Sequence, residues 1–477
     1  MANEKETKSK GQELADKLFF NLKSCWEGVD DNTEKEVEEL ASEYKKFLDR
    51  GKTERECVDV TCELLEKNGF VNVESLKDRK FKTGMKIYQN IRGKSVIAAI
   101  IGKKPAVEGC NILGAHVDSP RLDLKQNPLY EDSDFALLDT HYYGGIKKYQ
   151  WTAIPLSMHG VFINGDGKKT TVKIGEEPGD PVFTITDLLP HLAREQMEKK
   201  ASEFVEGENL DILAGSRPFI DKEVKEKVKL NLLSLLHEKY GITEKDFAGA
   251  EIEFVPAFKA SDIGFDRSMI GAYGHDDRCC AWPALKAITV LACEKTAQEK
   301  TVMCYLSDKE EIGSVGNTGA RSYNIENFLA MLCGGNEADL RICYTHSAML
   351  SADVNAAFDP TYAGVFEKKN ASFLGKGMVL TKYTGSGGKS GASDANAEFC
   401  AKVQAIMSRN KVQWQFGELG KVDKGGGGTI ALYAANLGMD VLDCGVPVLS
   451  MHSPFEVISK VDLYTTYRGY IAFLREA

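Results

Sequence analysis

Segments with strand-like and helix-like patterns alternate through the C-terminal half of the chain. Apolar runs with the length and composition of buried strands occur at 301–307, 348–354, 412–417 and 440–453. Segments with helical spacing of apolar residues lie between and around them, at 276–295, 393–409, 427–438 and 459–476. This alternation predicts an α/β fold, with a central mixed, largely parallel sheet flanked by helices.

The first half of the chain adds to this fold and then changes character. Helical segments near the N-terminus precede strand-like runs at 95–102 and 110–116. From residue 121 to 262 the sequence is more polar, and short strand-like runs alternate with charged helical pieces. We therefore expect one domain formed by 1–120 and 263–477, with 121–262 inserted as a separate β-rich domain.

Charge and composition limit the partners and the compartment that we expect. The 477 residues carry a net charge of −10 with a pI near 5.5, which argues against nucleic acid or an anionic membrane as the main partner. The N-terminal segment lacks the apolar core of a signal peptide, and no apolar run reaches membrane-spanning length. Twelve cysteines without a CxxC pair are typical of free thiols in a reducing compartment. We expect a cytoplasmic protein.

Histidines and acidic residues stand where predicted strands end. His116 ends the run 110–116, and Asp118 follows at a spacing that suits a metal ligand with a carboxylate behind its imidazole. Asp353 and His452 also lie at the ends of apolar runs. Taken singly, each residue fits an ordinary surface turn. Functional loops of α/β sheets gather at the carboxyl ends of strands, so we expect these side chains to meet.

Two acidic pairs extend this set. The segment GHDDR contains Asp276 and Asp277, which either cap the following helix or supply a carboxylate that bridges two metal ions. The segment LSDKEEIGS places Glu310 and Glu311 side by side after an apolar run. Ser307 and Glu310 also have the spacing of a helix capping box. The two glutamates alone therefore do not distinguish a helix cap from a metal site.

Two imidazoles and three carboxylates together form a donor set suited to a pair of zinc ions. The set is His116, Asp276, Glu311, Asp353 and His452. Zinc accepts nitrogen and oxygen ligands, whereas a site built for magnesium alone would be nearly all oxygen. A two-metal hydrolase also needs a proton carrier that is not bound to metal. Two neighbouring glutamates can divide these roles.

Five segments in this order resemble the aspartyl aminopeptidase and aminopeptidase I family of dizinc exopeptidases: GAHVDSPRLDLK, GHDDR, SDKEEIGS, SADVNAAFDP and VLSMHS. The resemblance implies a metallo-aminopeptidase that removes the N-terminal residue of peptides, with two Zn²⁺ ions per subunit. Co²⁺ or Mn²⁺ would suit the same donors. The resemblance also implies that Asp276 bridges the two metal ions and that Glu311 binds one of them. Glu310 is implied as the general base, and Asp118 as the residue behind His116.

The same resemblance suggests an assembly and a substrate pocket. The family places a dimerisation domain after the first histidine motif, where 121–262 lies, and forms tetrahedral dodecamers. It implies that His191, in LLPHLAREQ, reaches a neighbouring subunit's site and that Lys382 lies near the substrate. The residues after Trp151 and the loop KYTGSGGKSGASD depart from the aspartyl aminopeptidases. A preference for acidic N-terminal residues is therefore not implied, and a neutral or broader preference stays open.

Two alternative functions also remain at this point. A dipeptidase or a deacylase would use the same dizinc ligands with a different pocket. A non-catalytic scaffold, assembled through 121–262, would show no chelator-sensitive hydrolysis and would tolerate loss of Glu310.

Overall fold

The computed structural model describes residues 8–164 and 166–477, and its largest feature in that range is a mixed sheet of nine strands. In sheet order the strands are β1 (Val71–Asn72), β2 (Lys86–Ile91), β3 (Ser95–Ile100), β13 (Thr301–Ser307), β4 (Cys110–His116), β14 (Ala348–Ala352), β18 (Asp440–Gly445), β16 (Met378–Thr381) and β17 (Trp414–Phe416). The four central strands β13, β4, β14 and β18 run parallel. The predicted α/β fold with a mixed, largely parallel sheet is confirmed.

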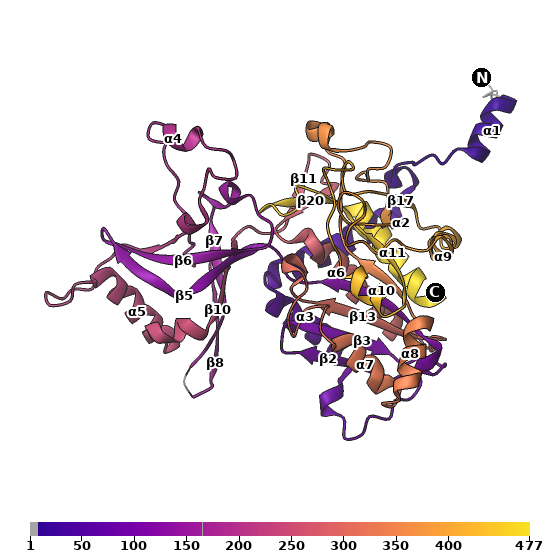
Figure 1. Cartoon of the computed structure of the whole chain (residues 1–477), viewed down its shortest axis with the longest axis horizontal. Coiled ribbons are helices and arrows are strands. Elements are labelled where there is room, and N and C mark those ends of the chain that lie inside the picture. The colour runs from indigo at the N-terminus through magenta and orange to yellow at the C-terminus, as the bar shows by residue number, and fades with distance from the viewer. Residues whose placement is uncertain (1–7, 165) are drawn as a thin grey trace.

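Helices cover both faces of this sheet (Figure 1). The helices of one face are α2 (Asp31–Arg50), α3 (Glu54–Lys67), α6 (His275–Ala292), α9 (Ala397–Arg409) and α11 (Lys460–Glu476). Those of the other face are α7 (Asn324–Leu332), α8 (Glu337–His346) and α10 (Ala431–Asn436). Along β13, Cys304 and Leu306 point into the first layer and Met303 and Tyr305 into the second. Burial of both faces explains why this strand is a continuous apolar run.

Helix α10 is shorter than the helical segment expected at 427–438. It begins only at Ala431, because the glycines of the run 425–428 stay in a loop. Glycine disfavours helix and favours irregular backbone. The loop borders the cleft described below.

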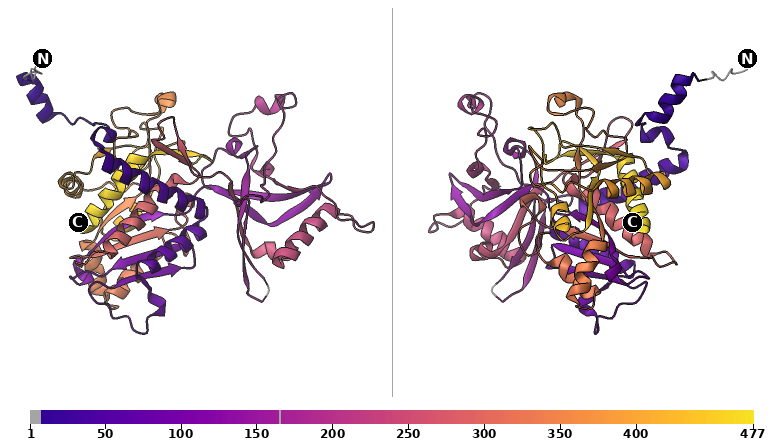
Figure 2. Two further views of the ribbon diagram at one scale, coloured as in Figure 1. Left: turned by 180° about the vertical axis from the view of Figure 1, so that it is seen from behind. Right: turned by 45° about the vertical axis from the view of Figure 1, so that its right-hand side comes forward.

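A second, antiparallel sheet lies beside the large one, and Figures 1 and 2 show it as a separate lobe. Its strands are β8 (Lys169–Ile174), β7 (Leu156–Ile163), β10 (Glu251–Pro256), β5 (Arg121–Asp132), β6 (Phe135–Tyr143) and β9 (Ile212–Gly215). Helix α5 (Lys227–Tyr240) packs against it, and α4 (Arg194–Met197) lies in a long excursion. All of these elements fall inside 121–262, the segment predicted to be an inserted domain.

A third sheet connects the start of α6 with the C-terminal segment. Its strands are β11 (Ser261–Ile263), β12 (Met269–Ala272), β20 (Glu456–Ser459), β19 (Pro447–Leu449) and β15 (Asn355–Ala356). Strand β12 leads directly into α6, and its partner β20 forms a hairpin with β19. The turn of that hairpin contains His452. This pairing brings His452 to the first turn of α6.

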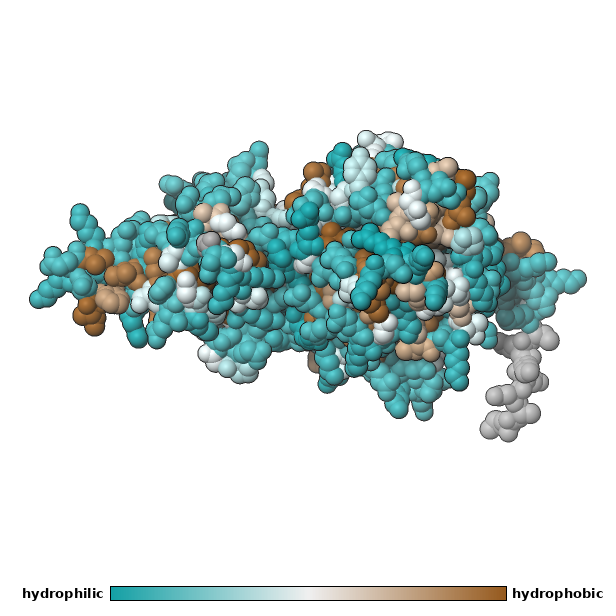
Figure 3. Space-filling view, turned by 90° about the horizontal axis from the view of Figure 1, so that it is seen from below, coloured by the Kyte–Doolittle hydropathy of each residue, from teal (hydrophilic) through white to brown (hydrophobic). Residues whose placement is uncertain are grey.

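The face seen in Figure 3 is mostly hydrophilic, with apolar patches at the far end of the second lobe and on the larger body. Exposed apolar residues of this lobe include Ile163, Val182, Leu188, Leu189, Leu192 and Leu235. Helix α1 (Lys10–Leu18) projects away from the body (Figure 1). In the described part of the chain, no helix has both the length and the apolarity to cross a membrane.

Candidate metal centre

Three adjacent parallel strands bring most of the predicted site residues to one edge of the large sheet. Strand β4 ends at His116, which pairs with Ser307 at the end of β13. Strand β14, on the other side of β4, ends directly before Asp353. Because parallel neighbours end at the same edge, Asp353 and the glutamates after β13 line one cleft, and Nε2 of His116 lies 3.8 Å from Oε2 of Glu310 in that lining.

Asp276 lies between the two candidate histidines. Its Oδ1 is 3.2 Å from Nε2 of His116, and its Oδ2 is 3.2 Å from Nε2 of His452. Asp276 is buried, yet the two imidazoles outweigh the effect of burial and keep the pKa of its carboxyl below the ordinary value. One carboxylate that offers an oxygen to each side has the arrangement of a bridging ligand.

Glu456 holds this arrangement in place and was not identified from the sequence. Its Oε2 accepts a hydrogen bond from the backbone N–H of Asp276 at 3.1 Å, and its Oε1 accepts one from that of His452 at 2.7 Å. Burial raises the pKa of Glu456 to about 8. Only the pairing of β20 with β12 places this carboxylate between two segments so distant in sequence.

The two neighbouring glutamates make their closest ion-pair contacts with different imidazoles. Oε2 of Glu311 is 3.4 Å from Nε2 of His452, and Oε2 of Glu310 is 3.8 Å from Nε2 of His116. Their backbone N–H groups each donate to the Asp118 carboxylate at 3.1 Å. Asp118 therefore fixes the turn that carries both glutamates.

The capping alternatives are not seen at either acidic pair. The Ser307 hydroxyl donates to the Ala115 carbonyl instead of capping a helix. Asp276 and Asp277 of GHDDR have non-helical backbone at the start of α6, and the Asp277 carboxylate accepts a hydrogen bond from the His116 backbone N–H instead of capping the helix. The third acid of the glutamate segment, Asp308, accepts a hydrogen bond from the Thr318 hydroxyl at 2.6 Å.

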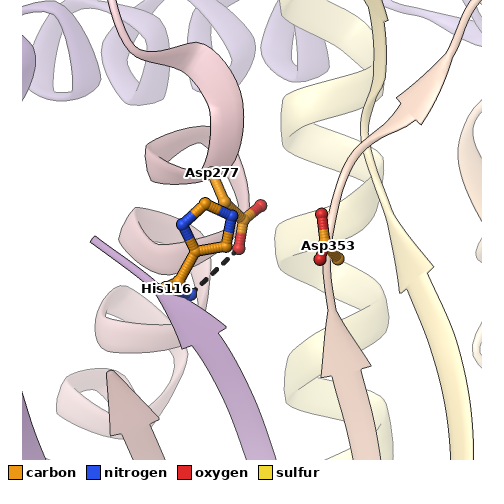
Figure 4. A group of neighbouring side chains, drawn as sticks. All are labelled: His116, Asp277 and Asp353. Atoms are coloured by element: carbon orange, nitrogen blue, oxygen red, sulfur yellow. Dashed lines mark hydrogen bonds between the residues drawn. The ribbon is translucent and has the colours of Figure 1, made fainter. Parts of the chain in front are cut away.

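Asp277 and Asp353 form a second group around His116 (Figure 4). One ligand atom from each of the three residues lies within 4.8 Å of the others. The dashed line in Figure 4 is the hydrogen bond from the His116 backbone N–H to Oδ2 of Asp277, 3.2 Å long. Asp277 thus bonds the main chain of β4, whereas Asp276 faces both imidazoles. This difference favours Asp276 over Asp277 as the bridge.

The charges of the site favour bound cations. Burial raises the pKa of Glu310 to about 7, and burial together with neighbouring carboxylates raises the pKa of both Glu311 and Asp353. Oε1 of Glu311 is buried without a hydrogen-bond partner among residues 8–164 and 166–477. Bound cations would neutralise these carboxylates, and Oε1 of Glu311 would be one of their ligands. With two imidazoles present, the donor set fits zinc.

A cleft of about 460 Å³ opens onto these residues. Carboxylates and His452 line one side, and the glycine loop with Thr429 lines another. Its apolar lining comes from Val354, Leu419, Leu432 and Met451. No lysine or arginine of the described chain lines it.

The two residues expected to contact substrate lie outside this cleft. His191 is exposed, in the excursion between β8 and α4, and does not line the cleft of its own chain. Its reach to a neighbouring subunit stays a prediction. Nζ of Lys382 donates to Asp394 at 2.6 Å and to the Ala395 carbonyl at 2.9 Å.

Comparisons with known proteins agree on one family. The family model described as "Aminopeptidase I zinc metalloprotease (M18)" matches residues 47–474. A probable M18 family aminopeptidase 1 of Clostridium acetobutylicum is 53% identical over 463 residues, covering 96% of this chain and 99% of the relative. A probable M18 family aminopeptidase 1 of Thermotoga maritima is 46% identical over 446 residues, covering 92% and 96%.

Solved structures give the same result. The crystal structure of aminopeptidase I from Clostridium acetobutylicum superposes with a TM-score of 0.90 at 51% identity, covering 96% of this chain and all of that one. The M18 aminopeptidase of Thermotoga maritima gives 0.91 at 44% identity, with the same coverage. The structure titled as the S. cerevisiae mApe1 dodecamer, 22% identical with a TM-score of 0.74 over 91% of this chain and 96% of that one, shares the fold.

Proposed function

Because the chain belongs to the M18 family of aminopeptidase I zinc metalloproteases and is a zinc-dependent aminopeptidase, we propose that it removes the N-terminal residue of peptides at a two-zinc site. The observation that carries the proposal is the position of Asp276, with one oxygen 3.2 Å from each candidate histidine. His116 and Asp353 would hold one zinc, His452 and Glu311 the other. Asp276 would be shared between them.

The chemistry follows from the residues around that carboxylate. Bound zinc ions would polarise the scissile carbonyl and acidify water; Co²⁺ or Mn²⁺ would suit the same donors. Glu310 accepts the proton from the attacking water and returns it to the nitrogen of the leaving peptide. Burial raises the pKa of the Glu310 carboxyl to about 7, so that it can both accept and release a proton near neutral pH. Asp118 orients His116 and holds the Glu310 backbone in place.

The cleft supports neutral N-terminal residues as substrates. Its apolar side chains would contact an uncharged side chain, and no lysine or arginine among the described residues lines it to pair with an acidic one. The Lys382 ammonium is already paired with Asp394. For Lys382 to bind substrate, as the family resemblance implies, the loop that carries Asp394 would have to move.

A homo-oligomer is also part of the proposal. The dodecamer of the yeast relative supports it, and so do the exposed apolar side chains on the second lobe. We propose a tetrahedral dodecamer in which 121–262 is the dimerisation domain and His191 reaches a neighbouring cleft. Light scattering on the purified protein tests this, since each chain contributes 52.5 kDa.

A substrate panel with controlled metal content tests the function. The apoenzyme and the zinc-loaded enzyme are assayed on tripeptides, dipeptides, aminoacyl p-nitroanilides with free or acetylated amines, and N-acyl amino acids. We expect zinc-dependent release of the first residue from tripeptides and from free-amine substrates with neutral side chains. Hydrolysis confined to dipeptides would identify a dipeptidase, and hydrolysis confined to N-acyl amino acids a deacylase. Zinc binding without hydrolysis would support a scaffold.

A further inference from the structure

The second lobe reaches into the candidate metal centre at the end of β6. Strand β6 ends at Tyr143, and Gly144 and Gly145 follow it. The Tyr143 hydroxyl donates to Oδ2 of Asp118 at 2.8 Å. The Gly145 carbonyl accepts a hydrogen bond from Nδ1 of His452 at 2.9 Å. One three-residue segment therefore contacts the carboxylate beside His116 and the ring of His452.

On the His116 side, Tyr143 completes the surroundings of Asp118. The Asp118 backbone carbonyl accepts from Nδ1 of His116 at 3.1 Å, which leaves Nε2 free to bind a metal. Its carboxylate already accepts two backbone hydrogen bonds from the glutamate turn. The tyrosine hydroxyl adds a third donor to a carboxylate that is fully buried. The Arg121 guanidinium lies 3.8 Å from the centre of the Tyr143 ring and fixes its orientation.

On the His452 side, the segment sets which nitrogen faces the metal. Because Nδ1 of His452 donates to the Gly145 carbonyl, Nε2 is the unprotonated nitrogen of the neutral ring. That Nε2 faces Asp276 and Glu311. Such partners orient a ligand histidine and make it more basic.

The glycines allow this close approach. Gly144 has a φ of +77°, which favours glycine, and a side-chain carbon there would lie 3.4 Å from Cβ of Glu311. A carbon on Gly145 would lie 3.4 Å from Nδ1 of His452. A side-chain carbon at either position would be in van der Waals contact with a candidate ligand, so a longer side chain would have to displace that ligand.

We propose that Tyr143–Gly145, a segment of the second lobe, is a clamp that positions both ligand histidines and thereby raises the affinity of the site for zinc. The proposal rests on the two-zinc function above and makes Tyr143 and Gly145 positioning residues. The second lobe is then a part of the metal centre, in addition to any role in assembly.

The test compares Tyr143→Phe with Tyr142→Phe. Both changes remove one hydroxyl, but Tyr142 is 41% exposed on the same strand, and its hydroxyl makes no hydrogen bond to a site residue in the described part of the chain. Zinc affinity is measured on the full-length protein by competition with a chromophoric chelator. We expect Tyr143→Phe to bind zinc about 10–100-fold more weakly, the range for partners of metal ligands, and Tyr142→Phe to match wild type.

Two further readouts separate positioning from general damage to the fold. Thermal unfolding of the metal-free proteins should change little in Tyr143→Phe, while the increase in Tm on adding zinc should shrink. At limiting zinc the kcat of Tyr143→Phe should be lower than that of wild type, and it should recover in excess zinc. Zinc affinity within about twofold of wild type, or an equal loss in Tyr142→Phe, would overturn the proposal.

A second variant keeps the test decisive if Tyr143→Phe does not fold. Gly145→Val requires no positive φ, and its branched carbons extend beyond a first carbon that would already lie 3.4 Å from Nδ1 of His452. We expect it to weaken zinc binding at least severalfold, and unchanged affinity would count against the clamp. If wild type binds zinc but hydrolyses no peptide, the proposed function is wrong. The comparison of zinc affinities still shows whether Tyr143–Gly145 positions the ligand histidines.

Discussion

Replacing Glu310 by glutamine should abolish catalysis while leaving the metal centre loaded. Glutamine has nearly the same shape, so Asp118 can still accept the backbone N–H at position 310. Its amide cannot accept the proton from water, which removes the general base. Such bases contribute about 10²–10⁴-fold to the rate, equivalent to about 3–5 kcal/mol of activation free energy. We expect kcat to fall by that factor with KM changed only a few-fold.

The matched control is Glu311→Gln, one residue further along the same turn. Its Oε2 lies 3.4 Å from Nε2 of His452, so this change should remove a metal ligand. Elemental analysis should find about two zinc ions per chain in Glu310→Gln and fewer in Glu311→Gln. Loss of zinc with activity largely intact in Glu310→Gln, or the opposite pattern between the two variants, would refute the assignment of roles.

Two further predictions concern metal removal and pH. Chelation should abolish hydrolysis and lower Tm, and added Zn²⁺ should restore both; hydrolysis by metal-free protein would contradict the two-zinc site. Buried His159 lies 2.9 Å from Glu56 and 3.2 Å from Glu176, and although burial opposes it, these acids raise the pKa of His159. A raised histidine pKa stabilises the native state fully below the unfolded value of about 6.5, and the contribution is lost as pH rises through the folded value. Glu176 keeps its ion pairs with Lys52 and Lys259 when His159 is replaced. His159→Gln should therefore cost about 1.5–3 kcal/mol at pH 6, the range for hydrogen bonds to charged groups, and less at alkaline pH. Urea unfolding at several pH values measures this, and a cost independent of pH would show that His159 is neutral.

The central fold was predictable because burial of both sheet faces leaves a clear record in sequence. Strands such as β13 and β4 are buried throughout and largely apolar, and few other structures suit runs of that length. The limits of α10 were less predictable, because a run of glycines can either enter a helix or stay outside it. The separate six-stranded sheet was expected only as a β-rich segment, without its strand order.

For the candidate site, strand ends were the informative signal. His116 and Asp353 stand at the ends of neighbouring parallel strands, so their meeting follows from topology alone. The assignment of Asp276 over Asp277 came from family resemblance, and the distances to both imidazoles now support it.

The α/β class, the order of the motifs and the kinds of donor atom available could be predicted from the sequence, because these depend on local periodicity and side-chain chemistry. The groups that support those donors could be identified only after the chain was folded. Glu456 joins α6 to the hairpin of His452, and Tyr143 and Gly145 come from the other lobe. A carboxylate, a phenol and a backbone carbonyl are common everywhere in a chain, and they gain a specific role only when folding brings distant segments within hydrogen-bond distance.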